Sequence, residues 1–211
     1  MTQAGWKQTL LEGYRGFRAG AYETYKDTYE TLGQQGQNPE ILLISCADSR
    51  ANPSQIFDVA PGEIFVVRNI ANLVPPYEDQ AGYHGISSAL EYAVTILKVK
   101  AVVIKGHENC GGIDAYIRGV ADGRDSSFIS QWIHLLDHAQ VRPYESLQGR
   151  DCLHTQLELA GIRMSLDNLM SYPFVRTAVE AGQLELLGLY FSISQGKLFA
   201  ADESGTFHEV E

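Results

Sequence analysis

A thiol, an acid and a guanidinium follow one apolar run of the chain at alternate positions. The segment ISCADSR places Cys46, Asp48 and Arg50 at and just after the end of the apolar run 41–46. Such a trio is compatible with a disulfide, a redox thiol, a salt bridge or a metal site. Other parts of the sequence must distinguish among these four kinds of site.

A second group with metal-binding chemistry follows another apolar run. The segment GHENCGG, residues 106–112, separates His107 from Cys110 by two residues, so both side chains can reach one point across a single turn. Ligands bind beyond the carboxyl ends of the strands in open parallel sheets. Cys46, His107 and Cys110 could therefore converge. Two thiolates and one imidazole suit Zn²⁺, and a three-ligand set leaves the fourth position open, as in catalytic zinc sites.

Each of these side chains also has a structural interpretation. The two thiols and His107 need not meet, because a lone buried cysteine is often only a small apolar residue. Asp48 and Arg50 could form a structural ion pair. The third thiol, Cys152, lies outside any strand and lacks polar neighbours, which favours a structural role as a buried thiol. A thiol oxidoreductase is disfavoured, since the chain has no Cys-x-x-Cys motif.

The elements that must position these residues alternate between strands and helices. The runs 41–46, 63–69 and 101–106 are continuously apolar, which is typical of strands covered on both faces. Apolar residues of 85–100 recur at the helical period between the second and third runs. This alternation predicts an α/β fold with a mostly parallel β-sheet flanked by helices. The pattern predicts further helices over 126–139, 154–171 and 173–182, and a hairpin over 184–202 that turns at Gln195 and Gly196.

The N-terminal segment has a different composition from the rest of the chain. Residues 5–32 are polar, with aromatic side chains at helical spacing, and predict one or two amphipathic helices before a loop at 33–40. We divide the chain into an N-terminal helical arm, 1–35, and an α/β zinc-binding catalytic domain, 36–211, within a single domain overall.

Composition restricts the partners and the compartment. The net charge of −10 and pI near 5.0 argue against nucleic acid or an anionic membrane as the main partner. The apolar runs are far shorter than the ~20 residues of a membrane span. The first 20 residues lack the features of a secretory signal. Three cysteines, an odd number, favour reduced thiols, so we expect a cytoplasmic protein.

The two chemical segments together resemble the signature blocks of the β-class carbonic anhydrases. CADSR and GHENCGG carry the resemblance most specifically. PGEIFVVRNIANLVPPY at 61–77, ALEYAV at 89–94 and LDNLMSYPFV at 166–175 are also similar to that family, especially to its plant-type branch. The resemblance covers about residues 36–200, which is most of the chain.

The resemblance implies a zinc lyase that reversibly hydrates carbon dioxide to bicarbonate and a proton through zinc-bound hydroxide. It makes Cys46, His107 and Cys110 the zinc ligands, and Asp48 and Arg50 the catalytic dyad. It also implies a carbon dioxide pocket that is completed across a dimer interface, in a homodimer or higher homo-oligomer. The N-terminal helices would pack on the partner subunit and embrace it. The residues at the pocket positions are Gln37, Phe65, Ile70, Tyr92 and Gly111.

Some positions depart from the family pattern. Glu108 and His84 stand where the family often has small residues; Glu108 could add negative charge or face solvent, and His84 is a candidate proton shuttle by residue type only. Leu43 replaces the tryptophan of a bicarbonate-binding pocket found in one branch, although Arg68 and Tyr190 match its other parts. We therefore expect no bicarbonate switch.

Two other functions remain open at this point. One is hydrolysis of carbonyl sulfide or carbon disulfide on the same scaffold. The other is a non-catalytic zinc-binding module, which would need neither Asp48 nor Arg50.

Overall fold

One six-stranded sheet organises the computed structural model, which describes residues 5–80, 82–119, 127–142, 147 and 152–211. The strands lie in the order β2-β1-β3-β4-β5-β6. The first four in this order are parallel, and β5 and β6 run antiparallel to their neighbours. The mostly parallel α/β fold is therefore confirmed. The strands are β1 (Ile41–Cys46), β2 (Ile64–Asn69), β3 (Ala101–His107), β4 (Glu185–Ser192), β5 (Lys197–Ala201) and β6 (Phe207–Glu209).

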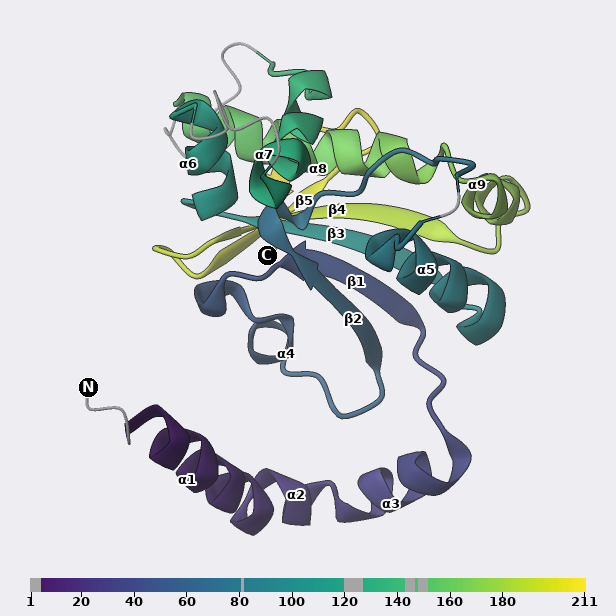
Figure 1. Cartoon of the computed structure of the whole chain (residues 1–211). Coiled ribbons are helices and arrows are strands. Elements are labelled where there is room, and N and C mark those ends of the chain that lie inside the picture. Colours follow the sequence, from purple (N-terminus) through teal and green to yellow (C-terminus); the bar gives the residue numbers. More distant parts are fainter. Residues whose placement is uncertain (1–4, 81, 120–126, 143–146, 148–151) are drawn as a thin grey trace.

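Helices flank this sheet, and three more form an arm that lies apart from it (Figure 1). In Figure 1, α6, α7 and α8 lie above the sheet and α4 lies below it. The longest, α8, buries ten of its 17 residues. The helices are α1 (Gly5–Ala19), α2 (Ala21–Thr24), α3 (Lys26–Gln35), α4 (Pro53–Ile56), α5 (Gly85–Glu91), α6 (Gly111–Ile117), α7 (Phe128–Ile133), α8 (Leu153–Leu169) and α9 (Pro173–Glu180). Three short 3-10 helices, which are wound more tightly than an α-helix, are η1 (Ser49–Ala51), η2 (Ile70–Asn72) and η4 (His134–His138). One π-helix, which is wound more widely, is η3 (Tyr92–Leu97).

The sequence predicted most of these elements, with differences at their ends. The helix expected over 85–100 is α5 followed by the wider π-type turn η3, and that expected over 126–139 is α7 followed by η4, with residue 126 outside the described residues. The loop expected at 33–40 is shorter, because α3 continues to Gln35. The hairpin of β4 and β5 turns at Gly196, whose φ of 66° suits glycine. The short elements η1, α4, η2, α6 and β6 were not predicted, and the N-terminal segment forms three helices rather than the expected one or two.

The central strands are buried on both faces, whereas β2 is not. In β1 and β3 every residue after the first is buried, as the continuous apolar runs predicted. In β2 most residues are only half-buried and Arg68 is exposed. The reason is topological: β2 is an edge strand of this sheet. The prediction that all three runs are covered on both faces is therefore wrong for β2 within one chain.

Parallel register brings the carboxyl ends of three strands to the same edge of the sheet. Cys46 at the end of β1 pairs with Asn69 at the end of β2, and Ser45 pairs with Lys105 of β3, two residues before His107. The residues predicted to do chemistry follow these strand ends. The sheet thus places them together without further adjustment.

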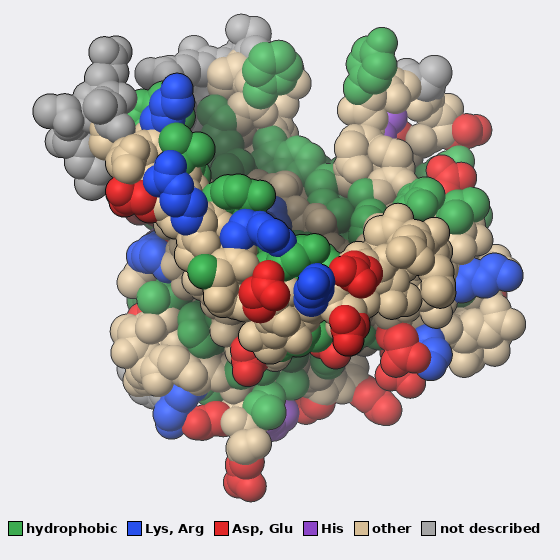
Figure 2. Space-filling view, turned by 90° about the horizontal axis from the view of Figure 1, so that it is seen from below, with side chains coloured by type: hydrophobic (Ala, Val, Ile, Leu, Met, Phe, Trp, Pro, Cys, Tyr) green, Lys and Arg blue, Asp and Glu red, His purple; other side chains and the backbone are tan. Residues whose placement is uncertain are grey.

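The arm exposes its apolar side chains. No residue of α1, α2 or α3 is buried, and Trp6, Leu10 and Tyr14 are 62%, 66% and 60% exposed. Figure 2, viewed from below, shows hydrophobic side chains open to view among charged ones. No described helix is long and apolar enough to cross a membrane.

Candidate metal centre

Three buried side chains with metal-binding atoms meet at the carboxyl edge of the sheet. Cys46 ends β1, His107 ends β3, and Cys110 is the residue immediately before α6. The two Sγ atoms are 3.9 Å apart, and one ligand atom of each of the three residues lies within 4.8 Å of the others. Asn109 allows the chain to turn between His107 and Cys110 with a left-handed φ of 51°, which asparagine tolerates well. The predicted Cys-His-Cys cluster therefore exists as a geometric unit.

The imidazole of His107 is oriented for a metal ion. Its Nδ1–H donates to the Glu108 carbonyl oxygen at 2.8 Å, since a carbonyl can only accept. That bond leaves Nε2 as the atom with a free lone pair. Nε2 is buried and has no hydrogen-bond partner among the residues that the structure describes. Buried polar atoms are rarely left in this state, so an orphaned nitrogen beside two thiols fits Zn²⁺.

The two thiols cannot both ionise easily without a cation. A hydrogen bond from Cys110 lowers the pKa of Cys46. The same contact, together with burial, raises the pKa of Cys110. Burial and the 3.9 Å separation of the two sulfurs therefore oppose the ionisation of both thiols together. A divalent metal would supply the positive charge that lets both become thiolates.

Asp48 and Arg50 form a two-pronged ion pair beside the cluster. Arg50 donates from Nε to Asp48 Oδ1 at 3.0 Å and from Nη2 to Oδ2 at 2.7 Å. The backbone N–H of Arg50 also donates to Oδ1. These bonds hold the pKa of Asp48 far below its usual range. Asp48 Oδ2 lies 3.8 Å from Nε2 of His107, next to the three ligand atoms but bonded to Arg50.

Two cationic side chains hold the first ligand turn, residues 46–51, by donating hydrogen bonds to its backbone carbonyl oxygens. Arg68 donates to the carbonyl oxygens of Cys46 and Asp48 at 2.9 and 2.7 Å. Lys105, which is fully buried, donates from Nζ to the carbonyl oxygen of Ala51 at 3.0 Å. Burial lowers the pKa of Lys105 to about 8. The sequence analysis did not single out Lys105, although a lysine inside the apolar run AVVIKGH was a visible signal.

Carboxylates hold the second ligand turn, residues 107–112. Glu108 is buried, and its carboxylate accepts hydrogen bonds from Ser192 Oγ and from the backbone N–H and Oγ of Ser194. Glu108 therefore neither faces solvent nor points at the cluster, and instead ties this turn to the β4–β5 hairpin. Glu158 of α8 accepts from the N–H of Cys110. The sequence analysis missed Glu158, a glutamate inside the apolar stretch LELAG.

The predicted substrate-pocket residues fall into two groups within one chain. Ile70 and Gly111 lie by the cluster: Ile70 directly follows β2, and a Cβ on Gly112 would be 2.7 Å from Ile70 Cγ2. Phe65 and Tyr92 contact each other, with ring centroids 6.0 Å apart. Phe65 precedes the end of β2 by four residues, or about 13 Å along the strand.

Gln37 is also remote from the cluster. It is exposed in the link between α3 and β1, at the end of β1 opposite to Cys46. A single chain therefore does not bring Gln37, Phe65 and Tyr92 to its own metal cluster.

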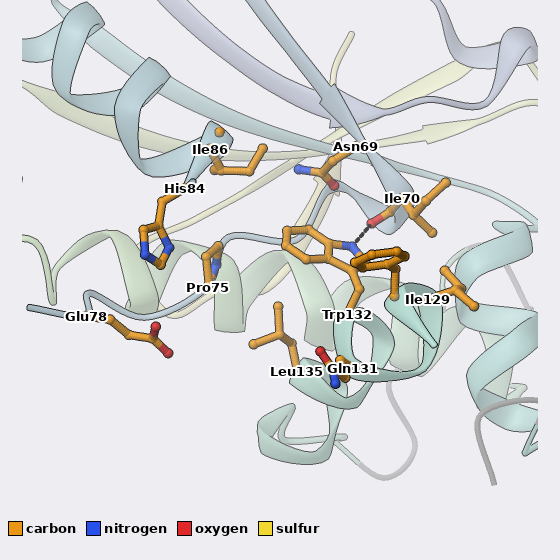
Figure 3. Close-up of a pocket in the computed structure, with 12 residues that line it drawn as sticks. Asn69, Ile70, Pro75, Glu78, His84, Ile86, Ile129, Gln131, Trp132 and Leu135 are labelled. Atoms are coloured by element: carbon orange, nitrogen blue, oxygen red, sulfur yellow. Dashed lines mark hydrogen bonds between the residues drawn. The ribbon is translucent and has the colours of Figure 1, made fainter. Parts of the chain in front are cut away.

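An open groove of about 820 Å³ borders the cluster side of the molecule (Figure 3). Trp132 of α7 forms part of its wall and donates from Nε1 to the carbonyl oxygen of Ile70 at 2.8 Å. His84 and Glu78 line the same groove farther from Ile70. The candidate shuttle His84 thus shares a cavity with a predicted pocket residue, and its role stays a prediction.

Two further predictions concern Cys152 and the bicarbonate pocket. Cys152 is exposed, immediately before α8, with its sulfur 3.3 Å from Thr155 Oγ1, so the expectation of a buried thiol is wrong. Leu43 is buried in β1, and Tyr190 donates its hydroxyl to Glu158. The absence of a bicarbonate switch stays a prediction, and these internal contacts support it.

Comparisons with known proteins agree with this geometry. The family model described as carbonic anhydrase matches residues 41–198. The chain is 35% identical over 195 residues to beta carbonic anhydrase 3 of Arabidopsis thaliana, covering 90% of this chain and 74% of the relative. It is 31% identical over 205 residues to a carbonic anhydrase of Synechocystis sp., covering 96% and 73%.

Solved structures give the same result. The β-carbonic anhydrase CcaA superposes with a TM-score of 0.83 at 30% identity, covering 98% of this chain and all of that one. One of two tetrameric β-carbonic anhydrases from Sordaria macrospora superposes with a TM-score of 0.74 at 29% identity, covering 92% and 95%. With the family model matching three quarters of its length, this chain belongs to the β-class carbonic anhydrases.

Proposed function

We propose that this chain is a zinc-dependent carbonate dehydratase that interconverts carbon dioxide and bicarbonate. One observation carries the proposal: a buried Cys-His-Cys cluster with an orphaned imidazole nitrogen lies directly beside an ion-paired aspartate. The curated relatives are named carbonic anhydrases, which supports the same reaction. Cys46, His107 and Cys110 would hold the zinc. Zinc in such a site acts as a Lewis acid that makes hydroxide available near neutral pH.

Asp48 is the residue that can orient the nucleophile. Its carboxylate lies next to the three ligand atoms and can only accept hydrogen bonds, so it can hold the proton of a hydroxide and leave an oxygen lone pair aimed at carbon dioxide. Arg50 occupies both carboxylate oxygens. That pairing keeps Asp48 ionised and holds it off the metal.

Carbon dioxide has no charge, so its pocket needs apolar walls and one hydrogen-bond donor. Ile70 and Gly111 lie at the cluster of their own chain, whereas Gln37, Phe65 and Tyr92 lie at the other end of the sheet. We infer that the second group serves the metal centre of a partner subunit. The partly exposed strand β2 and the exposed arm, described over Gly5–Gln35, support a homodimer in which the arm packs on the partner. The tetrameric relative supports association of this kind.

Metal analysis with a pH-dependent hydration assay tests the function. We expect about one zinc per chain and a hydration rate that rises with pH as the nucleophile ionises. Purified protein with far less than one zinc per chain, or with zinc and no hydration, would contradict the proposal. Sulfide release from carbonyl sulfide or carbon disulfide, assayed in parallel, tests the alternative hydrolase. The Asp48–Arg50 pair argues against a non-catalytic zinc module, which needs neither residue.

Mixed dimers test the shared pocket. Asp48→Asn removes the orienting acid, and Tyr92→Ala removes a pocket wall. If the pocket is shared, a dimer of one Asp48→Asn subunit and one Tyr92→Ala subunit contains one intact site and recovers activity that neither homodimer has. If each pocket forms within one chain, mixing restores nothing.

The compartment and the remaining partners stay proposals. We infer a cytoplasmic protein, because all three cysteines are unpaired and the proposed site needs two of them reduced. The net charge of −10 supports small-molecule substrates rather than nucleic acid.

A further inference from the structure

Glu158 is a buried carboxylate outside the ligand cluster that is bonded directly to a ligand residue. Its Oε1 accepts the backbone N–H of Cys110 at 2.9 Å and lies 2.8 Å from Nδ1 of His154. Its Oε2 accepts the hydroxyl of Tyr190 at 2.8 Å. Each of these three described partners is a donor, as the acceptor-only oxygens of a carboxylate require.

The N–H of Cys110 needs an acceptor from elsewhere in the fold. Cys110 is the N-cap residue of α6, and the N–H groups at a helix start have no partner within the helix. In a capping box, a glutamate or glutamine at the third helical position would accept this N–H. That position here is Ile113, which is apolar. Glu158 supplies the missing acceptor from α8, 48 residues away in sequence.

Close packing of α8 on the sheet brings Glu158 within hydrogen-bond distance of Cys110. A Cβ on Gly106 of β3 would be 2.7 Å from Ile162 Cδ1, and a Cβ on Gly188 of β4 would be 3.0 Å from Ile162 Cγ2. Ile162 therefore fits against the sheet only because both strand positions are glycine. Glu158 lies one helical turn before Ile162, on the same face of α8. This face delivers the carboxylate to the second ligand turn.

Burial of a carboxylate is unfavourable unless it has partners. Taking such a group from water costs several kcal/mol, and only good hydrogen bonds offset this. His154 is its only partner here that can be positively charged, among the described residues, and the bond to Glu158 raises the pKa of His154. A purely structural role for Glu158 would be to tie α8 to β4 through Tyr190. The bond to the Cys110 N–H serves a different purpose, because it fixes the backbone of a proposed metal ligand.

We propose that Glu158 is a positioning residue for the metal centre. Its Oε1 fixes the Cys110 N–H, which sets the direction of the Cys110 sulfur toward Cys46 and His107. The Nδ1–H of His154 donates a second hydrogen bond to the same carboxylate oxygen. This inference rests on the proposed zinc site and concerns the way in which one of its ligands is held.

Two substitutions at position 158 distinguish the effect of side-chain length from the effect of the carboxylate charge. Glu158→Gln keeps the length and one acceptor oxygen but removes the charge. Glu158→Asp keeps the charge but shortens the side chain by one methylene, so it no longer reaches Cys110. Tyr190→Phe is the matched control, because it removes a donor from the same carboxylate without touching Cys110.

Zinc affinity, measured by competition with a chelator, is the first readout. We expect Glu158→Asp to bind zinc about 10- to 100-fold more weakly, the usual effect of losing a group that orients a ligand. We expect Glu158→Gln and Tyr190→Phe to remain within about threefold of the original chain, since both keep an acceptor for Cys110. The thiolate-to-cobalt absorption of the Co²⁺-substituted protein should change in Glu158→Asp and stay the same in Tyr190→Phe.

NMR spectroscopy of Glu158→Gln provides a second measurement in case Glu158→Asp does not fold. Labelling with ¹⁵N-cysteine gives three backbone amide signals, one for each cysteine. In Glu158→Gln the Cys110 amide proton should move upfield, because its acceptor loses its charge, and the Cys46 amide should not move. Unchanged zinc affinity and cobalt absorption in Glu158→Asp would overturn the inference, as would an unmoved Cys110 amide in Glu158→Gln. If zinc affinity fell in Glu158→Gln but not in Glu158→Asp, the charge of residue 158 rather than its hydrogen bond to Cys110 would support zinc binding. That result would also overturn the inference. An original chain without stoichiometric zinc would instead refute the proposed function.

Discussion

The two turns that carry the metal-binding residues are held by opposite kinds of charge. In the first ligand turn, Arg68 and Lys105 donate to backbone carbonyl oxygens. In the second, Glu158 accepts a hydrogen bond from a backbone N–H, and Glu108 accepts hydrogen bonds from the β4–β5 hairpin. The first turn also carries Asp48, which is partly open to solvent, whereas His107 and Cys110 are buried. We propose from this difference that the first turn, besides carrying Cys46, positions the acid that acts on the nucleophile, whereas the second positions the two other metal-binding residues.

Removal of a ligand from either turn should have the largest effect. Cys46→Ser and Cys110→Ser each replace a soft thiolate, so both variants should lose zinc and about three orders of magnitude or more of hydration activity. Metal analysis and stopped-flow hydration check this. A variant that keeps both stoichiometric zinc and the full rate would show that its sulfur is not a ligand.

A matched pair of acid-to-amide changes comes next. Asp48→Asn should keep zinc but lose about 100- to 1,000-fold in turnover, because an amide is a poorer acceptor for orienting the nucleophile. Glu108→Gln, on the second turn, should weaken zinc binding by less than about tenfold and leave turnover per bound zinc nearly unchanged. Equal losses of turnover in both variants would remove the proposed difference between the turns.

Loss of Arg50 should lower activity and change the pH dependence of stability. In Arg50→Gln, Asp48 is free to turn to the metal, so we expect turnover to fall about 100-fold with zinc retained. The pairing depresses the pKa of Asp48, so its contribution to stability is fully present above the ordinary aspartate pKa of about 4 and is lost as the pH falls below it.

The stability of the original chain and of Arg50→Gln should therefore differ most above pH ~5 and converge in acid. The difference should be only about 1 kcal/mol, because Arg50 is half-exposed and solvent screens the pair. Denaturant unfolding across pH measures it. A gap that widens toward low pH would contradict this assignment.

Lys105→Met should lower turnover less than Asp48→Asn or Arg50→Gln does. The change removes the donor to the Ala51 carbonyl but also relieves the burial of an ammonium group, so the free energy of unfolding should change by less than about 2 kcal/mol. Turnover per zinc should fall about threefold to tenfold, because the turn that carries Asp48 is held less firmly. Zinc content should not change. If zinc were lost while turnover per bound zinc stayed the same, Lys105 would support metal binding, as we propose for the second turn, and not the position of Asp48.

The sequence was sufficient for the metal cluster because strand topology determines it. Cys46 and His107 end apolar runs, and adjacent parallel strands must bring such ends to one edge. The contacts that hold the cluster were not predictable in the same way. Glu158 lies in a helix whose period indicates which face is buried, but not which backbone N–H that face meets.

The pocket residues show a different limit. Gln37, Phe65 and Tyr92 were assigned by resemblance, and one chain places them far from its own cluster. No pattern within a single sequence reports which subunit a side chain serves. Cys152 was misjudged for a related reason: residue type favours burial, but its position just before α8 exposes it.

Because Cys152 is exposed, the number of cysteines that react with a thiol reagent shows whether the metal centre and the fold are intact. Cys152 is exposed, whereas Cys46 and Cys110 are buried. A thiol reagent should therefore modify one cysteine per chain in the intact enzyme. Chelation of the metal followed by unfolding should raise that number to the full three. A single dye on Cys152 could then follow the purified enzyme in solution with the metal centre left intact.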